Sequence, residues 1–284
     1  MESAIASVFK EQLNRHGYGF QYAVYNKAEQ LYTEGKSKWI FQACEVPVKT
    51  NSQQMHIDIV LECRSADIFL IGECKRVNPA FSSWCFCRTN RQRNREMPRI
   101  LVEQVNNDSS YDGKLNTTII SKLIESEYNL GIAVKNKVGK GDSEAPKGIG
   151  VDAIENAATQ VCCGLNGYVN LINKCRQLLG QNNRARLLPV IFTTAKLYTT
   201  EVDISLSELM TGNISGEIPL KHKPWLWFQY AQSDGIIHSL PDGGTLPKDL
   251  SGILDSRYIR TIPIVNSEGI ESFLSLDWAE LLSK

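Results

Sequence analysis

The sequence lacks both the long hydrophobic runs of a membrane protein and the charge excess of a general polyanion binder. No stretch of its 284 residues approaches the roughly 20 consecutive apolar residues that a membrane-spanning helix needs. Lys plus Arg and Asp plus Glu number 31 each, so a nucleic-acid site would have to be a local patch. A basic start followed by an apolar block, which marks a signal peptide, is also missing. We therefore expect a cytoplasmic protein without a membrane partner.

Motifs for zinc and for nucleotide phosphates are also missing. The eight cysteines include no C-x2-C pair, and neither Cys85-x-Cys87 nor Cys162-Cys163 has a histidine beside it. Zinc is therefore a minor alternative, and we expect reduced thiols that pack as small hydrophobes. The segment 138–150, "VGKGDSEAPKGIG", lacks the spacing of a phosphate-binding loop, which argues against nucleotide hydrolysis.

Hydrophobic periodicity predicts a mixed α/β fold. Five segments have apolar residues at helical spacing, or are otherwise expected to be helical: 3–15, 20–34, 116–128, 152–179 and 268–282. Six have the alternating or β-branched pattern of strands: 39–48, 55–63, 67–75, 187–200, 224–231 and 257–265. Within 224–231, Trp225, Trp227 and Phe228 alternate like residues packed on a core.

The order of these segments predicts a single domain spanning residues 1–284. The three successive strands in 39–75 form a meander, and the long helix then leads to a further strand, which implies a partly parallel, mixed sheet flanked by helices. We place the core at about 20–195, an insertion at 76–150, and added strands and a helix in 196–284.

Charged residues interrupt the third predicted strand near its end. In "DIFLIGECKRVNP", 67–79, Glu73 and Lys75 are two positions apart and share a face, because side chains alternate along a strand. The short "RSAD" connection would make a hairpin that brings Asp58 beside Glu73, with Cys74 facing the core. Buried charges are costly unless they are paired or bind a metal. Two carboxylates suit Mg²⁺ or Mn²⁺, and Lys75 could activate a water that attacks a phosphodiester.

This arrangement resembles the D…(D/E)-x-K signature of the PD-(D/E)XK nuclease superfamily, with its restriction-endonuclease-like αβββαβ core. The resemblance covers about residues 20–195 and extends to uncharacterised bacterial restriction-endonuclease-like proteins of similar length. It implies that Asp58 and Glu73 hold the metal and that Lys75 assists the water. Ile57 stands where the superfamily's name has Pro.

The sequence does not decide which further residues complete the site. Members of the superfamily often add a glutamate from the first core helix, for which Glu29 is the candidate and Glu11 the second choice. Glu45, near the end of the first strand, is a rival metal ligand. Some members add a polar residue from the crossover helix, and Gln160 lies at the margin of that helix's apolar stripe.

A basic segment follows the third strand. Four of its arginines, together with Arg76, are candidate nucleic-acid contacts: Arg88, Arg91, Arg93 and Arg95. Trp84 and Phe86 beside them could stack on bases. The alternative is a solvated loop.

We therefore expect a metal-dependent nuclease that acts on DNA rather than RNA and serves in bacterial defence. One rival is a non-catalytic nucleic-acid-binding or assembly subunit. Another is a nuclease effector that is active only with a ligand or with a partner protein of a defence system. A homodimer is compatible with each of these hypotheses.

Overall fold

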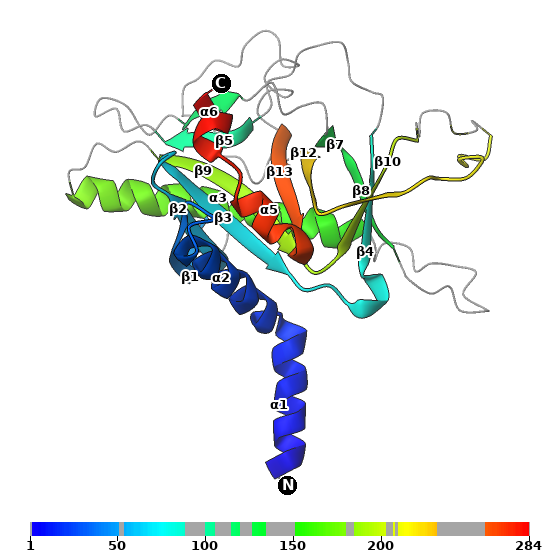
Figure 1. The fold of residues 1–284 in the computed structure, drawn as a ribbon, viewed down its shortest axis with the longest axis horizontal. Helices are drawn as coiled ribbons and strands as arrows, with labels where there is room; N and C mark the ends of the chain where they lie inside the picture. Colours follow the sequence, from blue (N-terminus) through cyan, green and yellow to red (C-terminus); the bar gives the residue numbers. More distant parts are fainter. Residues whose placement is uncertain are drawn as a thin grey trace.

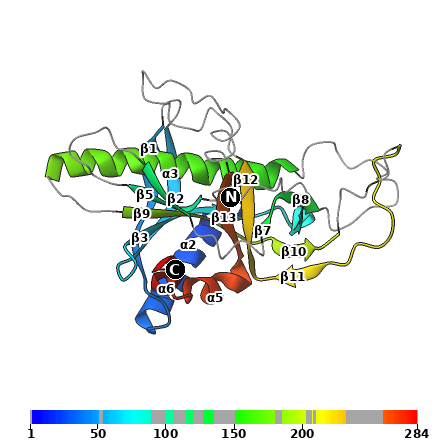
Figure 2. The same ribbon diagram turned by 90° about the horizontal axis from the view of Figure 1, so that it is seen from above.

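The computed structural model describes residues 2–50, 54–88, 100–105, 115–119, 127–134, 151–179, 185–202, 207, 210–231 and 259–283. Within them the chain forms a mixed α/β structure, as predicted, with a large sheet, a smaller sheet and helices on both faces of the large one (Figure 1). The long helix α3 lies on one face, and α2 with the C-terminal helices lies on the other (Figure 2). No helix in these residues is long and apolar enough to cross a membrane.

Two helices open the chain, as their periodicity predicts. Helix α1 spans Glu2–His16 and α2 spans Tyr18–Thr33, and they are separated at Gly17. Gly17 has a φ of 81°, a left-handed conformation that glycine adopts without steric cost. Helix α2 packs on the sheet through Val24, Ala28 and Leu31, whereas α1 extends away from the body (Figure 1).

The predicted meander is confirmed. Strands β1 (Trp39–Lys49), β2 (Gln54–Cys63) and β3 (Ile68–Lys75) pair antiparallel in that order. Helix α3 (Val151–Leu179) then crosses the sheet, and β9 (Ala185–Thr193) runs parallel to β3 over its whole length. The sheet is therefore partly parallel, as the long crossover helix predicts.

The remaining strands of the large sheet come from distant parts of the sequence. They are β5 (Ile100–Val105), β6 (Leu115–Ile119), β7 (Glu127–Tyr128), β12 (Trp225–Ala231) and β13 (Ile259–Asn266). Strand β13 pairs parallel with β9, so a segment expected as a C-terminal addition lies in the middle of the sheet. The prediction of a helix over 116–128 is wrong at both ends of that segment, which are the parts that the structure describes. Thr117 and Thr118 are β-branched, and pairing with β5 makes them a strand.

The smaller sheet contains β11 (Lys221–Lys223), β10 (Lys196–Thr200), β4 (Ser83–Cys87) and β8 (Leu130–Val134). A short 3₁₀ helix, Pro79–Phe81, leads into β4. Trp84 and Phe86 of β4 are each 1% exposed and pack in a core beneath α3. They cannot stack on bases, and that prediction is wrong, because alternation along β4 turns both rings inward.

The C-terminal helices complete the core on the α2 side. A 3₁₀ turn at Ser267–Gly269 leads into α5 (Ile270–Leu274), and α6 spans Trp278–Ser283. Phe273 and Trp278 are buried, and the Trp278 ring meets that of Trp39 edge-on at 5.8 Å. Trp227 is 3% exposed, which confirms it as a core residue. The end of the chain is therefore needed to cover β1 and α2.

Candidate active site

The side chains of strand β2 do not alternate regularly between the two faces of the sheet at Asp58. Residues two apart on a regular strand share a face. Here Ile57 packs beneath α3, where a Cβ on Gly164 would lie 3.2 Å from its Cγ1 atom, whereas Ile59 packs in the core on the α2 side. The backbone at Asp58 must therefore depart from regular alternation.

Strand β1 is distorted at the same level. Cys44 pairs with Ile59 and Val46 pairs with Ile57, so Glu45 stands across from Asp58. Glu45 has a φ of 50°, in the left-handed region that costs a non-glycine residue roughly 1–3 kcal/mol. Such strain persists only where the surrounding structure imposes it, and it concentrates at functional sites. The backbone distortion is thus independent evidence that the sheet has a functional site at Glu45 and Asp58.

Asp58 is held from two directions where β2 and β3 stop pairing. The last paired residues are Ile59 and Gly72. Beyond them, Oδ2 of Asp58 accepts a hydrogen bond of 2.6 Å from the backbone N–H of Cys74. The side chain of Gln21 on α2 donates a 2.7 Å bond to the Asp58 carbonyl. The carboxylate of Asp58 therefore lies against β3, next to Glu73.

Glu73 and Lys75 form the other half of the cluster. Nζ of Lys75 lies 2.6 Å from Oε1 of Glu73, and the Glu73 residue is only 6% exposed. Burial raises the pKa of Glu73 to about 7, and the negative charge of Asp58 adds to this effect while Lys75 opposes it. Burial also raises the pKa of Asp58, against the lowering effects of the Cys74 N–H and Lys75. The buried Glu73 thus pairs with the ammonium of Lys75, whose charge also acts on the half-buried Asp58, and this arrangement of two carboxylates favours a further cation.

Cys74 lies between these charged residues but faces the other way. Its side chain packs against the core on the α2 side, as predicted. Burial raises the pKa of its thiol well above the ordinary value, and the negative charge of Asp58 acts in the same direction. The thiol therefore stays protonated and unreactive.

The donor set fits a hard divalent cation held by two carboxylates. Within the residues described, no three His, Cys, Asp or Glu side chains converge into a ready-made cage. Mg²⁺ does not need one, because it commonly binds one or two carboxylates and fills its shell with waters and substrate phosphates. Asp58 and Glu73 meet that requirement. Glu45 is half-buried, and its charge acts on both of them.

Three predicted site residues are not brought to this cluster. Glu29 is exposed on α2, about 12 Å along the helix from Gln21, and it hydrogen-bonds Tyr25 instead. Glu11 is exposed on α1, which points away from the body (Figure 1). Gln160 lies on the exposed side of α3, because the face that meets the sheet runs through Val161, Gly164 and Leu165.

Of the arginines predicted to contact nucleic acid, Arg76 and Arg88 are described by the structure, and each has different neighbours. Arg76 is exposed, and its guanidinium donates to the carbonyl of Asn14 near the end of α1. Arg88 lies over the ring of Tyr128, 5.2 Å from its centroid, and 3.9 Å from the carboxylate of Glu201. The other three, Arg91, Arg93 and Arg95, lie outside the described residues.

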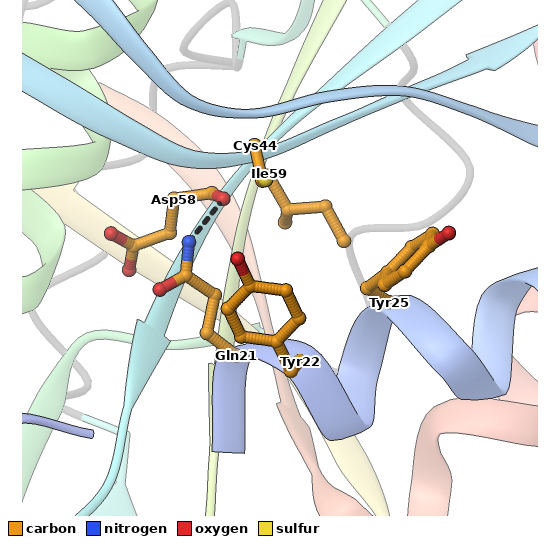
Figure 3. A pocket seen from close by; sticks show the side chains of 6 residues that line it. All are labelled: Gln21, Tyr22, Tyr25, Cys44, Asp58 and Ile59. Atoms are coloured by element: carbon orange, nitrogen blue, oxygen red, sulfur yellow. Dashed lines mark hydrogen bonds between the residues drawn. The ribbon is translucent and has the colours of Figure 1, made fainter. Parts of the chain in front are cut away.

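A shallow hollow adjoins Asp58 on the α2 side. It is lined by Gln21, Tyr22, Tyr25, Cys44, Asp58 and Ile59 (Figure 3). Tyr22 is 51% exposed, and its ring meets that of Tyr25 edge-on at 6.5 Å. In Figure 3 the Tyr22 hydroxyl points toward β2, whereas that of Tyr25 points away. An exposed aromatic ring therefore lies beside Asp58 on the α2 side of the sheet.

Gln21 is a residue that the sequence interpretation missed. It is 5% exposed and lies one turn before Val24 on the buried stripe of α2. A polar residue at the start of that stripe was the available signal.

Replacing Gln21 with alanine should destabilise the protein by roughly 1–2 kcal/mol, because the part-buried carbonyl of Asp58 would lose its donor. Urea unfolding measures this change. Gln30→Ala is the matched control, because Gln30 is exposed on the same helix and bonds only the exposed Glu34; its effect should stay within about 0.5 kcal/mol. Equal losses in the two variants would show that the contact with Asp58 is unimportant.

Comparison with known proteins identifies no relative. No protein-family model, curated protein or solved structure matches the chain. Function is therefore inferred from the contacts of Asp58, Glu73 and Lys75 themselves.

Proposed function

We propose that this protein is a metal-dependent nuclease that hydrolyses phosphodiester bonds in DNA. The observation that carries the proposal is the cluster where β2 and β3 stop pairing: the Asp58 carboxylate accepts from the Cys74 N–H, next to the buried Glu73, which pairs with the ammonium of Lys75. Strongly perturbed carboxyl groups beside a specific charged partner are a feature of functional sites. The strained backbone of Glu45 at the same level supports this reading.

Asp58 and Glu73 are the residues that would hold Mg²⁺ or Mn²⁺, with Glu45 as an outer carboxylate. When bound, such a cation lowers the pKa of a coordinated water and neutralises charge on the phosphate. Lys75 is 29% exposed on its side chain, so its ammonium is accessible from solvent while it remains against Glu73. From that position it can orient the attacking water and stabilise negative charge that develops on the phosphate.

The order of elements around the cluster supports a restriction-endonuclease-like core. Helix α2, the meander β1–β3, the crossover helix α3 and the parallel strand β9 follow one another as in the αβββαβ arrangement. The cluster also lies on the second and third strands of that arrangement, on which the PD-(D/E)XK signature is carried.

Nicking of supercoiled plasmid DNA tests the proposal. With Mg²⁺ or Mn²⁺ the protein should convert supercoiled plasmid to the open-circular or linear form, and EDTA should abolish conversion. Single-stranded RNA of matched length provides the substrate comparison. Absence of metal-dependent conversion of DNA in the presence of either cation would contradict the proposal.

A non-catalytic binding subunit is the main rival. It would retard DNA in a gel in EDTA and would produce no nicks when metal is added. A partner-dependent effector would also be inactive alone, so Mn²⁺ binding to the purified protein separates the two. Binding that is lost in Glu73→Gln favours the effector, and absence of Mn²⁺ binding favours the subunit.

A further inference from the structure

Helix α2 carries a stripe of tyrosines beside its buried face. Four of the ten tyrosines of the chain lie in its 16 residues: Tyr18, Tyr22, Tyr25 and Tyr32. Successive members are four, three and seven residues apart, which places them on one stripe at about 100° per residue. Tyr18, Tyr22 and Tyr32 are 45%, 51% and 46% exposed. A row of exposed rings differs from the single exposed hydrophobic residues that are ordinary on protein surfaces.

The hollow beside Asp58 shows which part of this stripe adjoins the candidate active site. Tyr22 and Tyr25 line the hollow together with Asp58 (Figure 3). The Tyr25 ring supports that of Tyr22 edge-on and itself lies 4.2 Å from the ring of Phe41. Gln21 directly precedes Tyr22, and its 2.7 Å bond to the Asp58 carbonyl holds α2 against β2 at this point. The Tyr22 ring is therefore both exposed and positioned relative to Asp58.

The first tyrosine of the stripe lies near the charged end of β3. Tyr18 begins α2, and Gly17 before it lies against Arg76, because a Cβ on Gly17 would be 3.7 Å from the Arg76 Cβ. Arg76 directly follows Lys75. Tyr18 and Tyr22 are thus one helical turn apart, the first near a guanidinium and the second near a carboxylate of the cluster.

We propose that Tyr18 and Tyr22 stack on unpaired bases of the substrate, which makes single-stranded DNA the substrate class of the candidate active site. Proteins that bind a single strand combine cationic groups along the backbone with aromatic rings on which bases stack. In a duplex the bases stack on each other, so the rings gain a partner only where the strands are open. This inference rests on the proposed nuclease function and adds the substrate to it. Negative supercoiling assists strand opening, so supercoiled plasmid is still a substrate.

Fluorescence anisotropy with a labelled DNA oligonucleotide, in EDTA at fixed salt, tests this inference. The wild type should bind the single strand more tightly than a hairpin duplex. Tyr22→Ala should weaken single-strand binding by about 5–150-fold, the range for loss of one stacking ring, and Tyr18→Ala should act in the same direction. Tyr22→Trp should retain binding, because it keeps an aromatic ring. Neither alanine variant should change the dependence of affinity on salt, because a tyrosine ring carries no charge that neutralises a phosphate.

Tyr32→Ala is the matched control. Tyr32 is exposed on the same stripe, about 15 Å along the helix from Tyr22 and outside the hollow, so its replacement should change affinity by less than about twofold. Equal affinities of Tyr22→Ala and Tyr32→Ala, or tighter binding of the duplex, would overturn the inference whatever the plasmid assay shows. Single-strand binding that depends on Tyr22, without metal-dependent nicking of plasmid, would support the stacking and contradict the nuclease proposal. Tighter binding of RNA of the same sequence would contradict the assignment to DNA.

Discussion

Replacing Lys75 with alanine should lower metal-dependent plasmid cleavage by about 10²–10⁴-fold, the usual contribution of a positioned acid–base group. The side chain of Lys75 is part-exposed and makes a 2.6 Å contact with Glu73, so its loss removes the ammonium without opening the core. The fold should be retained, which circular dichroism measures. Asp58→Asn should abolish cleavage as well, because the amide oxygen can still accept from the Cys74 N–H but carries no charge.

Lys38→Ala is the matched control for this experiment. Lys38 is an exposed lysine that precedes β1, at the opposite end of the meander from Asp58. Its replacement should leave cleavage unchanged within about twofold, since surface changes away from a site are usually near neutral. If Lys75→Ala cleaves as fast as Lys38→Ala, Lys75 has no catalytic role and the proposed site is wrong.

Replacing Glu73 with glutamine should stabilise the metal-free protein at pH 8 while abolishing cleavage. The pKa of Glu73 is raised to about 7 from the ordinary 4.5. A group whose folded pKa is raised contributes stability that is fully present below about pH 4.5 and is lost as pH rises through about 7. A shift of this size corresponds to something on the order of 3 kcal/mol. Glutamine removes the buried charge, so the expected gain at pH 8 is roughly 1–3 kcal/mol.

Unfolding by urea in EDTA, at pH 5 and at pH 8, measures this effect. At pH 5 the wild type already holds Glu73 mostly neutral, so the two proteins should differ little. Glu62→Gln on the same meander is the control, because Glu62 makes only exposed contacts with Gln42 and Arg64. It should change stability by no more than about 0.5 kcal/mol at either pH. If Glu73→Gln is the less stable protein at pH 8, Glu73 is a structural partner of Lys75 and the metal hypothesis loses its main support.

The experiments on Lys75 and Glu73 distinguish a catalytic role from a structural one. Neutralising a residue that stabilises the fold should lower the stability, whereas neutralising a residue that binds a metal should lower the activity and relieve charge repulsion. Glu73 is buried beside Asp58, so the second outcome is expected.

Local patterns were sufficient for the elements that carry the candidate site. The apolar periods of 20–34 and 152–179 predict α2 and α3 closely, because each helix buries one continuous face, and the pattern of 55–63 predicts β2. The spacing of Glu73 and Lys75 also predicts their contact, since residues two apart on a strand share a face. The position of Asp58 near them needed only the short connection between β2 and β3.

The sequence by itself thus determined the meander, the crossover helix and the identity of the three charged residues, since these depend on neighbours in the chain. Only the tertiary structure decided the left-handed backbone of Glu45, the contact of Gln21 with Asp58 and the place of β13 beside β9. Each of these depends on pairing or packing between segments far apart in sequence, and local propensity does not encode such partners. Glu29 and Gln160 lie outside the cluster for the same reason. A helix can be predicted from its apolar period, but the residue that it turns toward a given part of the sheet depends on how the helix packs against that sheet.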